Sequence, residues 1–208
     1  MPRLQRDFFD RSTVDVARDL LGQRLVHAVN GRRLAGLITE TEAYVGEADL
    51  ACHARVGRTA RTSRLCGPPG HAYVYLNSGI HWMFNVVCER DGFAAAVLIR
   101  AILPTEGLDR IRANRGGKPD KILADGPGKL CQALAITGAD HGRDLCARTA
   151  PVFFEAAPPA DVVATAPRIG IDFAPEPWRS IDWNFTWPTA RARAAISPTG
   201  RRPTDEEE

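Results

Sequence analysis

The asparagine–glycine pair at positions 30 and 31 constrains the fold of this chain more than any other local feature. It separates two runs rich in aliphatic residues, 25–29 and about 34–41. Asn-Gly favours the tight turn whose backbone twist matches that of two paired antiparallel strands. The sequence therefore predicts a β-hairpin, and with it a sheet that is largely antiparallel.

Further strands and helices are expected on both sides of this hairpin. Runs rich in β-branched and aromatic residues predict strands at 72–76, 82–87 and 94–102, with short ones at 151–154 and 162–171. Capping and stop signals predict one helix between Ser12 and Gly22, one from Pro104 to about Gly117, and one from Pro127 to Gly138. The fold class expected from this order is α+β.

Length and composition fit one domain with a substantial core. The chain has 208 residues, of which 44% are hydrophobic and 25% charged, as in an ordinary soluble globular protein. We expect a single domain over residues 1–196, built on a curved, largely antiparallel β-sheet flanked by helices and long loops. The acidic stretch 197–208 is expected to be a disordered tail.

Targeting signals and cysteine usage indicate a cytosolic protein. Charged residues or glycine interrupt every candidate membrane span, and no apolar stretch follows the first positive charges. The five cysteines include no CxxC pair, so we expect buried thiols and neither a disulfide framework nor a zinc site. No metal or cofactor is predicted.

The positive charge of the chain is concentrated in one segment. Residues 50–88 contain no aspartate or glutamate. The long loop expected at 45–69 overlaps this region and carries there an arginine at every third position: Arg55, Arg58, Arg61 and Arg64. Such a ladder suits a surface that neutralises nucleic-acid phosphates and releases their counterions. The alternative is a solvated loop whose charges are regularly spaced by accident.

Candidate catalytic residues precede this loop. Glu42 and Tyr44 are expected at a strand end, with His53 nearby in the sequence. An acid, a histidine and aromatic rings beside a basic loop can form a pocket for a base taken out of the nucleic-acid stack. Of the two tyrosines that flank Val74, Tyr73 and Tyr75, we expect one to face this pocket and the other to pack elsewhere or face solvent.

Several motifs together resemble the alkyladenine (3-methyladenine) DNA glycosylase family. They are ETEAY at 40–44, GHAYVY at 70–75, LIRA at 98–101, GPGKLCQALAI at 126–136 and PRIGI at 167–171. The resemblance extends from about residue 17 to residue 183, with the motifs in the family's order. It implies an enzyme that flips damaged purines from duplex DNA and hydrolyses the N-glycosidic bond.

The resemblance also assigns roles to individual residues. Glu42 matches the general base that activates water, and Arg100 matches the arginine that positions this water. The base-binding pocket is matched by four residues: Tyr44, His53, Tyr75 and Asn85. The wedge that fills the space left by the flipped base falls on Ser78, which is too small for that task. Either Leu76 or His81 replaces it, or the flipped nucleotide is less well supported.

Double-stranded DNA containing damaged purines is the expected partner of a monomeric protein that does not contact membranes. The arginine ladder and Lys129 are expected to contact the DNA backbone from DNA-facing loops. The chain has only three lysines, Lys118, Lys121 and Lys129, and none adjoins Glu42. A glycosylase that also cuts the strand usually uses an amine nucleophile, so we expect a monofunctional enzyme in the bacterial cytosol.

Two other functions remain open at this point. A catalytically silent damage-binding protein would use the same aromatic pocket without needing Glu42. A metal-dependent hydrolase or base deaminase is the other alternative, although the HxE and PCxxC motifs of the zinc deaminases are missing from the sequence.

Overall fold

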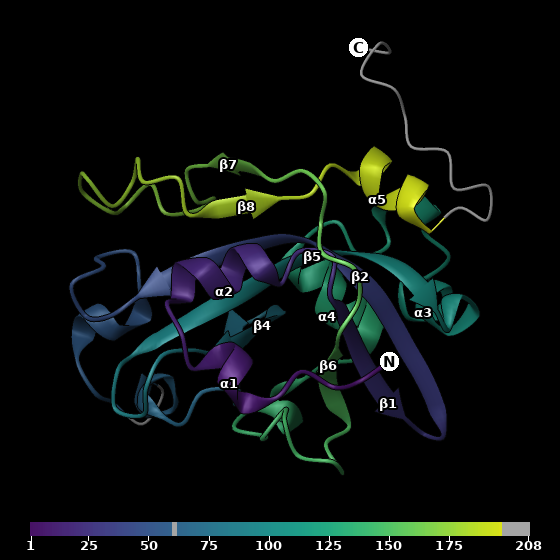
Figure 1. The fold of residues 1–208 in the computed structure, drawn as a ribbon, viewed down its shortest axis with the longest axis horizontal. Helices are drawn as coiled ribbons and strands as arrows, with labels where there is room; N and C mark the ends of the chain where they lie inside the picture. The colour runs from purple at the N-terminus through teal and green to yellow at the C-terminus, as the bar shows by residue number, and fades with distance from the viewer. Residues whose placement is uncertain (60–61, 197–208) are drawn as a thin grey trace.

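A computed structural model describes residues 1–59 and 62–196 (Figure 1). The strands described are β1 (Arg24–Val29), β2 (Arg32–Val45), β3 (Ala72–Asn77), β4 (His81–Val87), β5 (Ala95–Glu106), β6 (Val152–Glu155), β7 (Ala164–Ala166) and β8 (Asn184–Thr186). The α-helices are α1 (Arg6–Phe9), α2 (Thr13–Asp19), α3 (Leu108–Asn114), α4 (Pro127–Leu134) and α5 (Thr189–Ala195). Short 3₁₀ helices are η1 (His53–Val56), η2 (Thr62–Cys66), η3 (Asp120–Ile122) and η4 (Gly138–Asp140).

The strands form one curved antiparallel sheet in the order β3-β4-β5-β2-β1-β6, with β8 paired to both β2 and β7 (Figure 1). Helices pack against it, so the predicted α+β class is confirmed. The predicted hairpin is also confirmed, because Val29 pairs with Arg32 across the turn. Asn30 and Gly31 both have positive φ angles, 50° and 71°, as this turn type requires.

β2 is the central strand, and three other strands pair with it. β5 pairs along almost its whole length, β1 pairs with its first half, and β8 pairs with residues 40–42. The predicted strand end near residue 41 was wrong, since β2 continues to Val45. Glu42 is therefore held inside the sheet, between strands on both sides.

One face of the sheet carries the hydrophobic core. Helices α2 and α4 pack on it, and the core includes Val16 and Ala17 from α2, Leu130 and Leu134 from α4, and Ile99 from β5. Because side chains alternate along a strand, the neighbours of these core residues point to the opposite face. That opposite face carries the cavity described below.

Several element boundaries differ from those expected. α4 ends at Leu134 instead of Gly138, because Ala135 adopts the left-handed conformation with φ 57°. β5 extends through Pro104 to Glu106, and α3 begins only after Gly107. The long basic loop contains η1 and η2, and the strand expected at 162–171 is reduced to β7. The tail at 197–208 lies outside the described residues.

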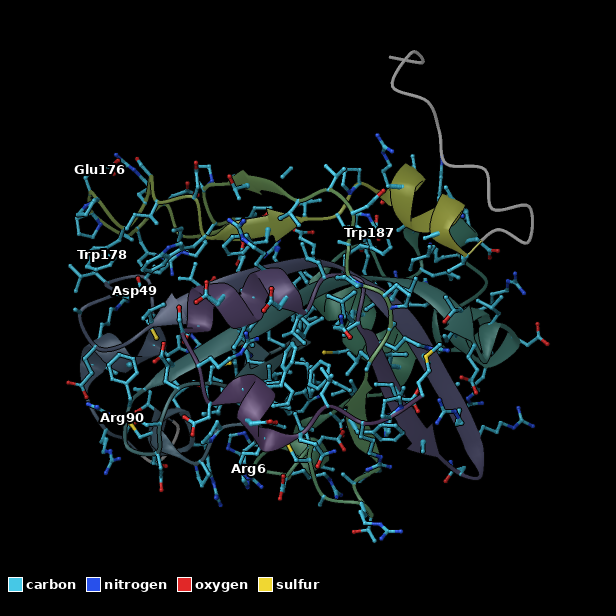
Figure 2. All side chains as sticks on the ribbon, viewed as in Figure 1. Arg6, Asp49, Arg90, Glu176, Trp178 and Trp187 are labelled. Atoms are coloured by element: carbon cyan, nitrogen blue, oxygen red, sulfur yellow. The ribbon has the colours of Figure 1, made fainter. Side chains whose placement is uncertain are left out.

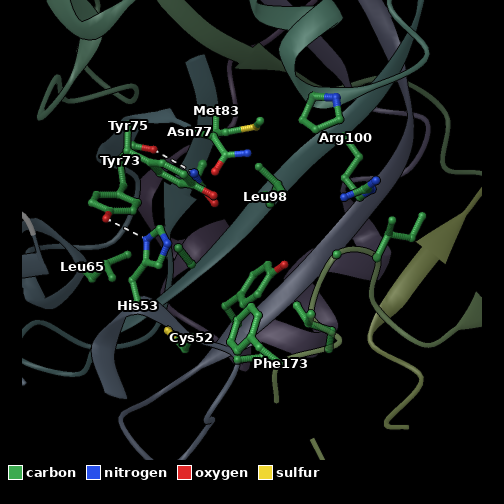
Figure 3. A pocket seen from close by; sticks show the side chains of 18 residues that line it. Cys52, His53, Leu65, Tyr73, Tyr75, Asn77, Met83, Leu98, Arg100 and Phe173 are labelled. Carbon is green, nitrogen blue, oxygen red and sulfur yellow. Dashed lines mark hydrogen bonds between the residues drawn. The ribbon is translucent and has the colours of Figure 1, made fainter. Parts of the chain in front are cut away.

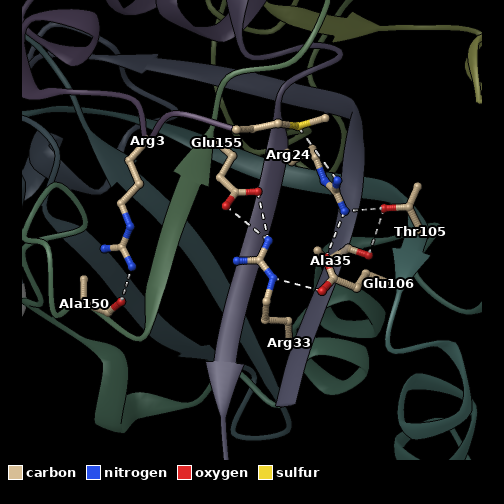
Figure 4. A network of polar contacts seen from close by, with 9 residues as sticks. Arg3, Arg24, Arg33, Ala35, Thr105, Glu106, Ala150 and Glu155 are labelled. Carbon is tan, nitrogen blue, oxygen red and sulfur yellow. Dashed lines mark hydrogen bonds and ion pairs between the residues drawn. The ribbon is translucent and has the colours of Figure 1, made fainter. Parts of the chain in front are cut away.

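A network of charged side chains fixes the N-terminal segment on β1, β2 and β6 (Figure 4). Arg33 bonds both Glu106 and Glu155, and the pKa of Arg33 is raised mainly by its hydrogen bond to Glu155. Arg3 places its guanidinium 3.5 Å from the centre of the Phe153 ring. Since Arg33 and Glu106 are each more than a third exposed, the ion pair between them contributes little to stability.

The helices and the cysteines bear on two further expectations: that the chain does not span a membrane and that its thiols are buried. Within the described ranges, every helix is too short or too polar to cross a membrane. All five cysteines are free, and four of them are buried, while Cys146 is partly exposed. Burial raises the pKa of the Cys52 thiol to about 11, which makes it unreactive at neutral pH.

Candidate active site

A cavity of about 290 Å³ opens on the face of the sheet opposite the core (Figure 3). Its walls come from β2, β3, β4 and β5, from η1 and η2, and from the loop at 169–173. The volume lies at the small end of the range for ligand pockets, roughly 300–1,000 Å³. The cavity therefore suits one small, flat ligand.

One row of side chains crosses five strands, and its members either line the cavity or lie behind its wall. Tyr73 on β3 lies opposite Asn85 on β4, which lies opposite Leu98 on β5. Leu98 in turn lies opposite Glu42 on β2, and Glu42 lies opposite Asn184 on β8. Residues directly opposite one another point to the same face of a sheet, so the register alone brings these side chains together.

Glu42 is completely buried and accepts a hydrogen bond or ion pair at four positions. Its Oε1 accepts from the backbone N–H of Ile169 (2.7 Å) and from the amide of Asn184 (3.1 Å). Its Oε2 accepts from the Tyr44 hydroxyl (2.8 Å) and faces the Arg100 guanidinium at 3.3 Å. The carboxylate is thus held rigidly, and Arg100 is the cation that faces its negative charge.

Arg100 links this carboxylate to a second one. Its Nε donates to Glu40 Oε1 at 2.7 Å, and the Asn184 amide also donates to that oxygen, at 2.9 Å. Burial lowers the pKa of Arg100, but the charges of Glu42 and Glu40 outweigh this effect and leave the pKa raised. The guanidinium is therefore a permanent cation at the cavity wall.

Three rings form the aromatic wall of the cavity (Figure 3). The His53 ring meets Tyr75 edge-on with centres 4.6 Å apart, and its Nδ1 lies 3.1 Å from the Tyr73 hydroxyl. The expectation that only one of the two tyrosines faces the pocket was wrong. Residues two apart on a strand lie on the same face, so Tyr73 and Tyr75 both line the cavity.

Asn85 lies at the cavity floor in a fixed orientation. It is almost fully buried, and its Nδ2 donates to the backbone carbonyl of Tyr73 at 3.0 Å. With the amide held in this way, a single polar side chain meets any ligand that reaches the floor. Asn85 can therefore discriminate between ligands by the hydrogen-bonding groups on their inner edge.

A buried ion pair supports Tyr44 from the side away from the cavity. Arg168 binds both carboxylate oxygens of Asp49, and neither side chain is exposed. The Arg168 guanidinium lies 4.8 Å from the centre of the Tyr44 ring and also donates to the backbone carbonyl of Trp178. Asp49 and Trp178 lie at the same end of the molecule (Figure 2).

The structure thus brings all the expected catalytic and base-pocket residues together: Glu42, Tyr44, His53, Tyr75, Asn85 and Arg100. It adds four residues to which sequence reasoning gave no role: Glu40, Arg168, Ile169 and Asn184. Three of these lie in motifs already singled out: Glu40 in ETEAY, and Arg168 and Ile169 in PRIGI. Asn184 carried no such signal, because its role depends on the pairing of β8 with β2.

The residues expected to contact the DNA backbone lie on two separate parts of the fold. Arg55, Arg58 and Arg64 are exposed on the segment that forms η1 and η2, whereas Arg61 lies outside the described residues. Arg55 also donates to the backbone carbonyl of Leu50. Lys129, in the first turn of α4, forms an ion pair with Asp125 at 2.9 Å and stays about half exposed.

The expected wedge position lies in the turn between β3 and β4. Ser78 is exposed and has a positive φ angle of 50°. Of the two replacements expected, Leu76 is 39% exposed, and His81 is also exposed, beside Gly128 at the start of α4. Ile80, at 71% exposure, is a more prominent apolar side chain in the same turn. No role was expected for Ile80.

Comparisons with known proteins agree with this arrangement. Residues 7–191 match the family model described as methylpurine-DNA glycosylase. A protein of Methanocella arvoryzae named "Putative 3-methyladenine DNA glycosylase" is 48% identical over 201 residues, covering 94% of this chain and all of the relative. Proteins with the same name from Rhodopseudomonas palustris and Alkaliphilus oremlandii are 48% and 43% identical, covering 86% and 85% of this chain and 86% and 94% of their own.

Proposed function

Because the chain belongs to the methylpurine-DNA glycosylase family, a family of hydrolytic DNA glycosylases, we propose that it starts base excision repair by removing damaged purines. The proposed substrate is duplex DNA that contains 3-methyladenine, 7-methylguanine, hypoxanthine or ethenoadenine. The enzyme flips the damaged nucleotide into the cavity and hydrolyses its N-glycosidic bond. We further propose that it acts as a monomer in the cytosol.

The observation that carries this proposal is the position of Glu42 behind the wall of an aromatic cavity. A purine ring that enters the cavity contacts the faces or edges of Tyr44, His53 and Tyr75. N-alkylated purines are cationic, and aromatic faces attract cations. The cavity therefore favours lesions that are already good leaving groups.

Glu42 is proposed to act as the general base. Water must lose a proton as it attacks the anomeric carbon, and general-base catalysis of such a step typically contributes about 10²–10⁴-fold. The negative charge of Glu42 also stabilises the positive charge that develops on the sugar. Arg100 holds the carboxylate in place, since it contacts both Glu42 and Glu40.

Strand cleavage is not part of the proposed reaction. An enzyme that cuts the strand by β-elimination needs an amine to attack the sugar, and none of the described residues that line the cavity is a lysine. The proposed product is an abasic site. Asn85 is proposed to disfavour undamaged guanine, whose exocyclic amine would meet a fixed amide at the cavity floor.

Duplex DNA is proposed to lie across the cavity mouth. Exposed arginines of the segment 50–88 are suited to bind phosphates, and the β3–β4 turn presents Leu76 and Ile80. Apolar side chains of this kind can be inserted between base steps in DNA. We propose that one of these two residues occupies the gap that the flipped base leaves.

The test is base release by the purified protein in the presence of a chelator, from a duplex with a single hypoxanthine and from methylated genomic DNA. We expect release from both substrates, and Glu42→Gln should abolish it while damaged DNA is still bound. Glu106→Gln serves as the matched control, because Glu106 belongs to the network around Arg33 instead.

Each outcome of this experiment has a defined meaning. Release from methylated DNA alone would restrict the enzyme to cationic lesions. Binding without release from either substrate would establish the damage-binding alternative and refute the proposed enzyme. Turnover by Glu42→Gln close to the parental rate would remove Glu42 from the mechanism.

A further inference from the structure

Asn184 joins the two acidic side chains of β2, Glu40 and Glu42. It is buried, and its Nδ2 donates to Glu40 Oε1 at 2.9 Å and to Glu42 Oε1 at 3.1 Å. These contacts follow from the register, in which Asn184 lies directly opposite Glu42 on the neighbouring strand β8. One amide group therefore holds together two carboxylates whose like charges repel each other.

The surroundings of this amide determine its orientation. Thr186, two residues further along β8, donates from its hydroxyl to Asn184 Oδ1 at 3.2 Å, while Nδ2 faces the two carboxylates. A flipped amide would place the acceptor Oδ1 beside two negatively charged groups that have no proton to donate. The Asn184 side chain is therefore a donor with one fixed direction.

Arg100 makes a second bridge between the same two carboxylates. Its Nε donates to Glu40 Oε1 at 2.7 Å, and its Nη1 forms an ion pair with Glu42 Oε2 at 3.3 Å. Asn184 and Arg100 thus contact the same oxygen of Glu40 but different oxygens of Glu42. The four side chains form a closed ring of contacts, so a shift of Asn184 would reach Glu42 directly and Arg100 through Glu40.

The two oxygens of Glu42 have different partners. Oε1 accepts from Asn184 and from the backbone N–H of Ile169. Oε2 contacts the side chains of Tyr44 and Arg100, which both line the cavity. Asn184 therefore anchors one oxygen of the carboxylate and leaves the other beside Arg100.

We propose that Asn184 is a positioning residue for base release, an inference that rests on the proposed function. Its amide sets the direction of the Glu42 carboxylate, and through Glu40 it also sets the position of the Arg100 guanidinium. A misplacement of about 1 Å in a catalytic site can slow the reaction by about 10²-fold. Because Asn184 is not among the described residues that line the cavity, loss of its amide should slow the chemical step and leave DNA affinity unchanged.

The experiment measures the single-turnover rate of base release and the affinity for DNA, with the hypoxanthine duplex and methylated DNA as substrates. Asn184→Ala should release the base roughly 10- to 100-fold more slowly than the wild type, with an unchanged dissociation constant. Asn114→Ala is the matched control, because it removes another side-chain amide, one that donates to the backbone carbonyl of Ala133. This control should release the base at the wild-type rate.

Two variants of Glu40 separate positioning from a purely structural role. Glu40→Gln keeps an oxygen that can accept from both Arg100 and Asn184, whereas Glu40→Ala removes it. Glu40→Gln should therefore lose less of the rate than Glu40→Ala. This comparison still applies if Asn184→Ala fails to fold, and equal losses in the two Glu40 variants would overturn the connection through Glu40 to Arg100.

The remaining outcomes distinguish this inference from the proposed function. Release by Asn184→Ala at the wild-type rate would overturn the positioning role, and so would weaker DNA binding with an unchanged rate in the bound complex. Turnover by Glu42→Gln close to the parental rate, or no release by the wild type from either substrate, would refute the proposed function and the inference with it.

Discussion

Arg168 shows how a residue outside the cavity can determine the geometry inside it. It donates to the backbone carbonyl of Ala43, to both oxygens of Asp49 and to the carbonyl of Trp178, while its guanidinium lies beside the Tyr44 ring. Ala43 lies between Glu42 and Tyr44 in β2. Arg168 therefore fixes the backbone from which both side chains project.

Removal of this arginine should destabilise the protein strongly. Arg168→Leu leaves the Asp49 charge buried without a partner, and breaking a buried pair in this way typically costs about 3–5 kcal/mol. The measurement is the urea midpoint with its slope. In the double variant Arg168→Leu/Asp49→Leu, most of that stability should return, since no lone charge remains. A double variant no more stable than the single one would contradict this explanation.

His141 should make the stability of the protein depend on pH. Its Nδ1 accepts a hydrogen bond from the backbone N–H of Val74 at 3.1 Å, and burial, followed by the charge of Arg64, lowers its pKa. The unfolded state therefore binds this proton more readily than the folded state, so stability should fall as the pH drops below about 6.5. Urea midpoints at pH 7.5 and pH 5 measure the loss, and His141→Gln should make it smaller. An equal loss in both proteins would assign the pH dependence to other groups.

At the scale of elements, the β3–β4 hairpin combines a tight turn with exposed apolar residues. Ser78 and Gly79 have φ angles of 50° and 72°, and the N–H of Ile80 donates to the carbonyl of Asn77. Two successive positive φ angles are typical of a tight turn that prefers Asn or Gly, and the pairing of Asn77 with His81 leaves three residues in this loop. The turn thus favours small residues at position 78, and apolar bulk is available only at its flanks.

Replacement of Ser78 by a large ring should prolong the complex with damaged DNA. In Ser78→Tyr, the ring can fill the space left by the flipped base, and the conformational cost should stay below about 1 kcal/mol because Ser78 already adopts positive φ. Dissociation from a hypoxanthine duplex is the measurement. Ser78→Asn, which suits the turn but cannot act as a wedge, is the control. If Ser78→Tyr dissociates as fast as the wild type, Leu76 or Ile80 already fills the gap.

The sequence predicted local structure better than long-range register. Asn30-Gly31 was sufficient to predict the β1–β2 hairpin, and the ETEAY motif identified Glu42 and Tyr44. Asn184 could not be found in this way, because it meets Glu42 across 142 positions of sequence through the β2–β8 pairing. The boundaries of α4 and β5 also depend on tertiary contacts that outweigh local propensity.

At the scale of the whole molecule, the acid-free segment 50–88 and the cavity coincide. His53, Leu65, Tyr75 and Asn77 all line the cavity and all come from this segment, which also carries the exposed residues Arg55, Arg58 and Arg64. Part of the cavity wall, the β3–β4 turn and the exposed arginines thus belong to one continuous stretch of chain. Under the proposed function, phosphate contacts and base extrusion would therefore act on the same stretch of duplex.

Binding to DNA should therefore weaken steeply with salt. Each phosphate contact contributes about 0.9 to the slope of log affinity against log salt concentration, so Arg58→Gln should reduce the slope by about that amount, equally on damaged and undamaged duplexes. Arg110→Gln is the matched control, because Arg110 is an exposed arginine on α3, outside the segment 50–88. Titrations between 50 and 200 mM salt, roughly the range in which such contacts are resolved, give the slopes. A flat salt response of the wild type, or the same loss for both variants, would show that DNA does not bind along this segment.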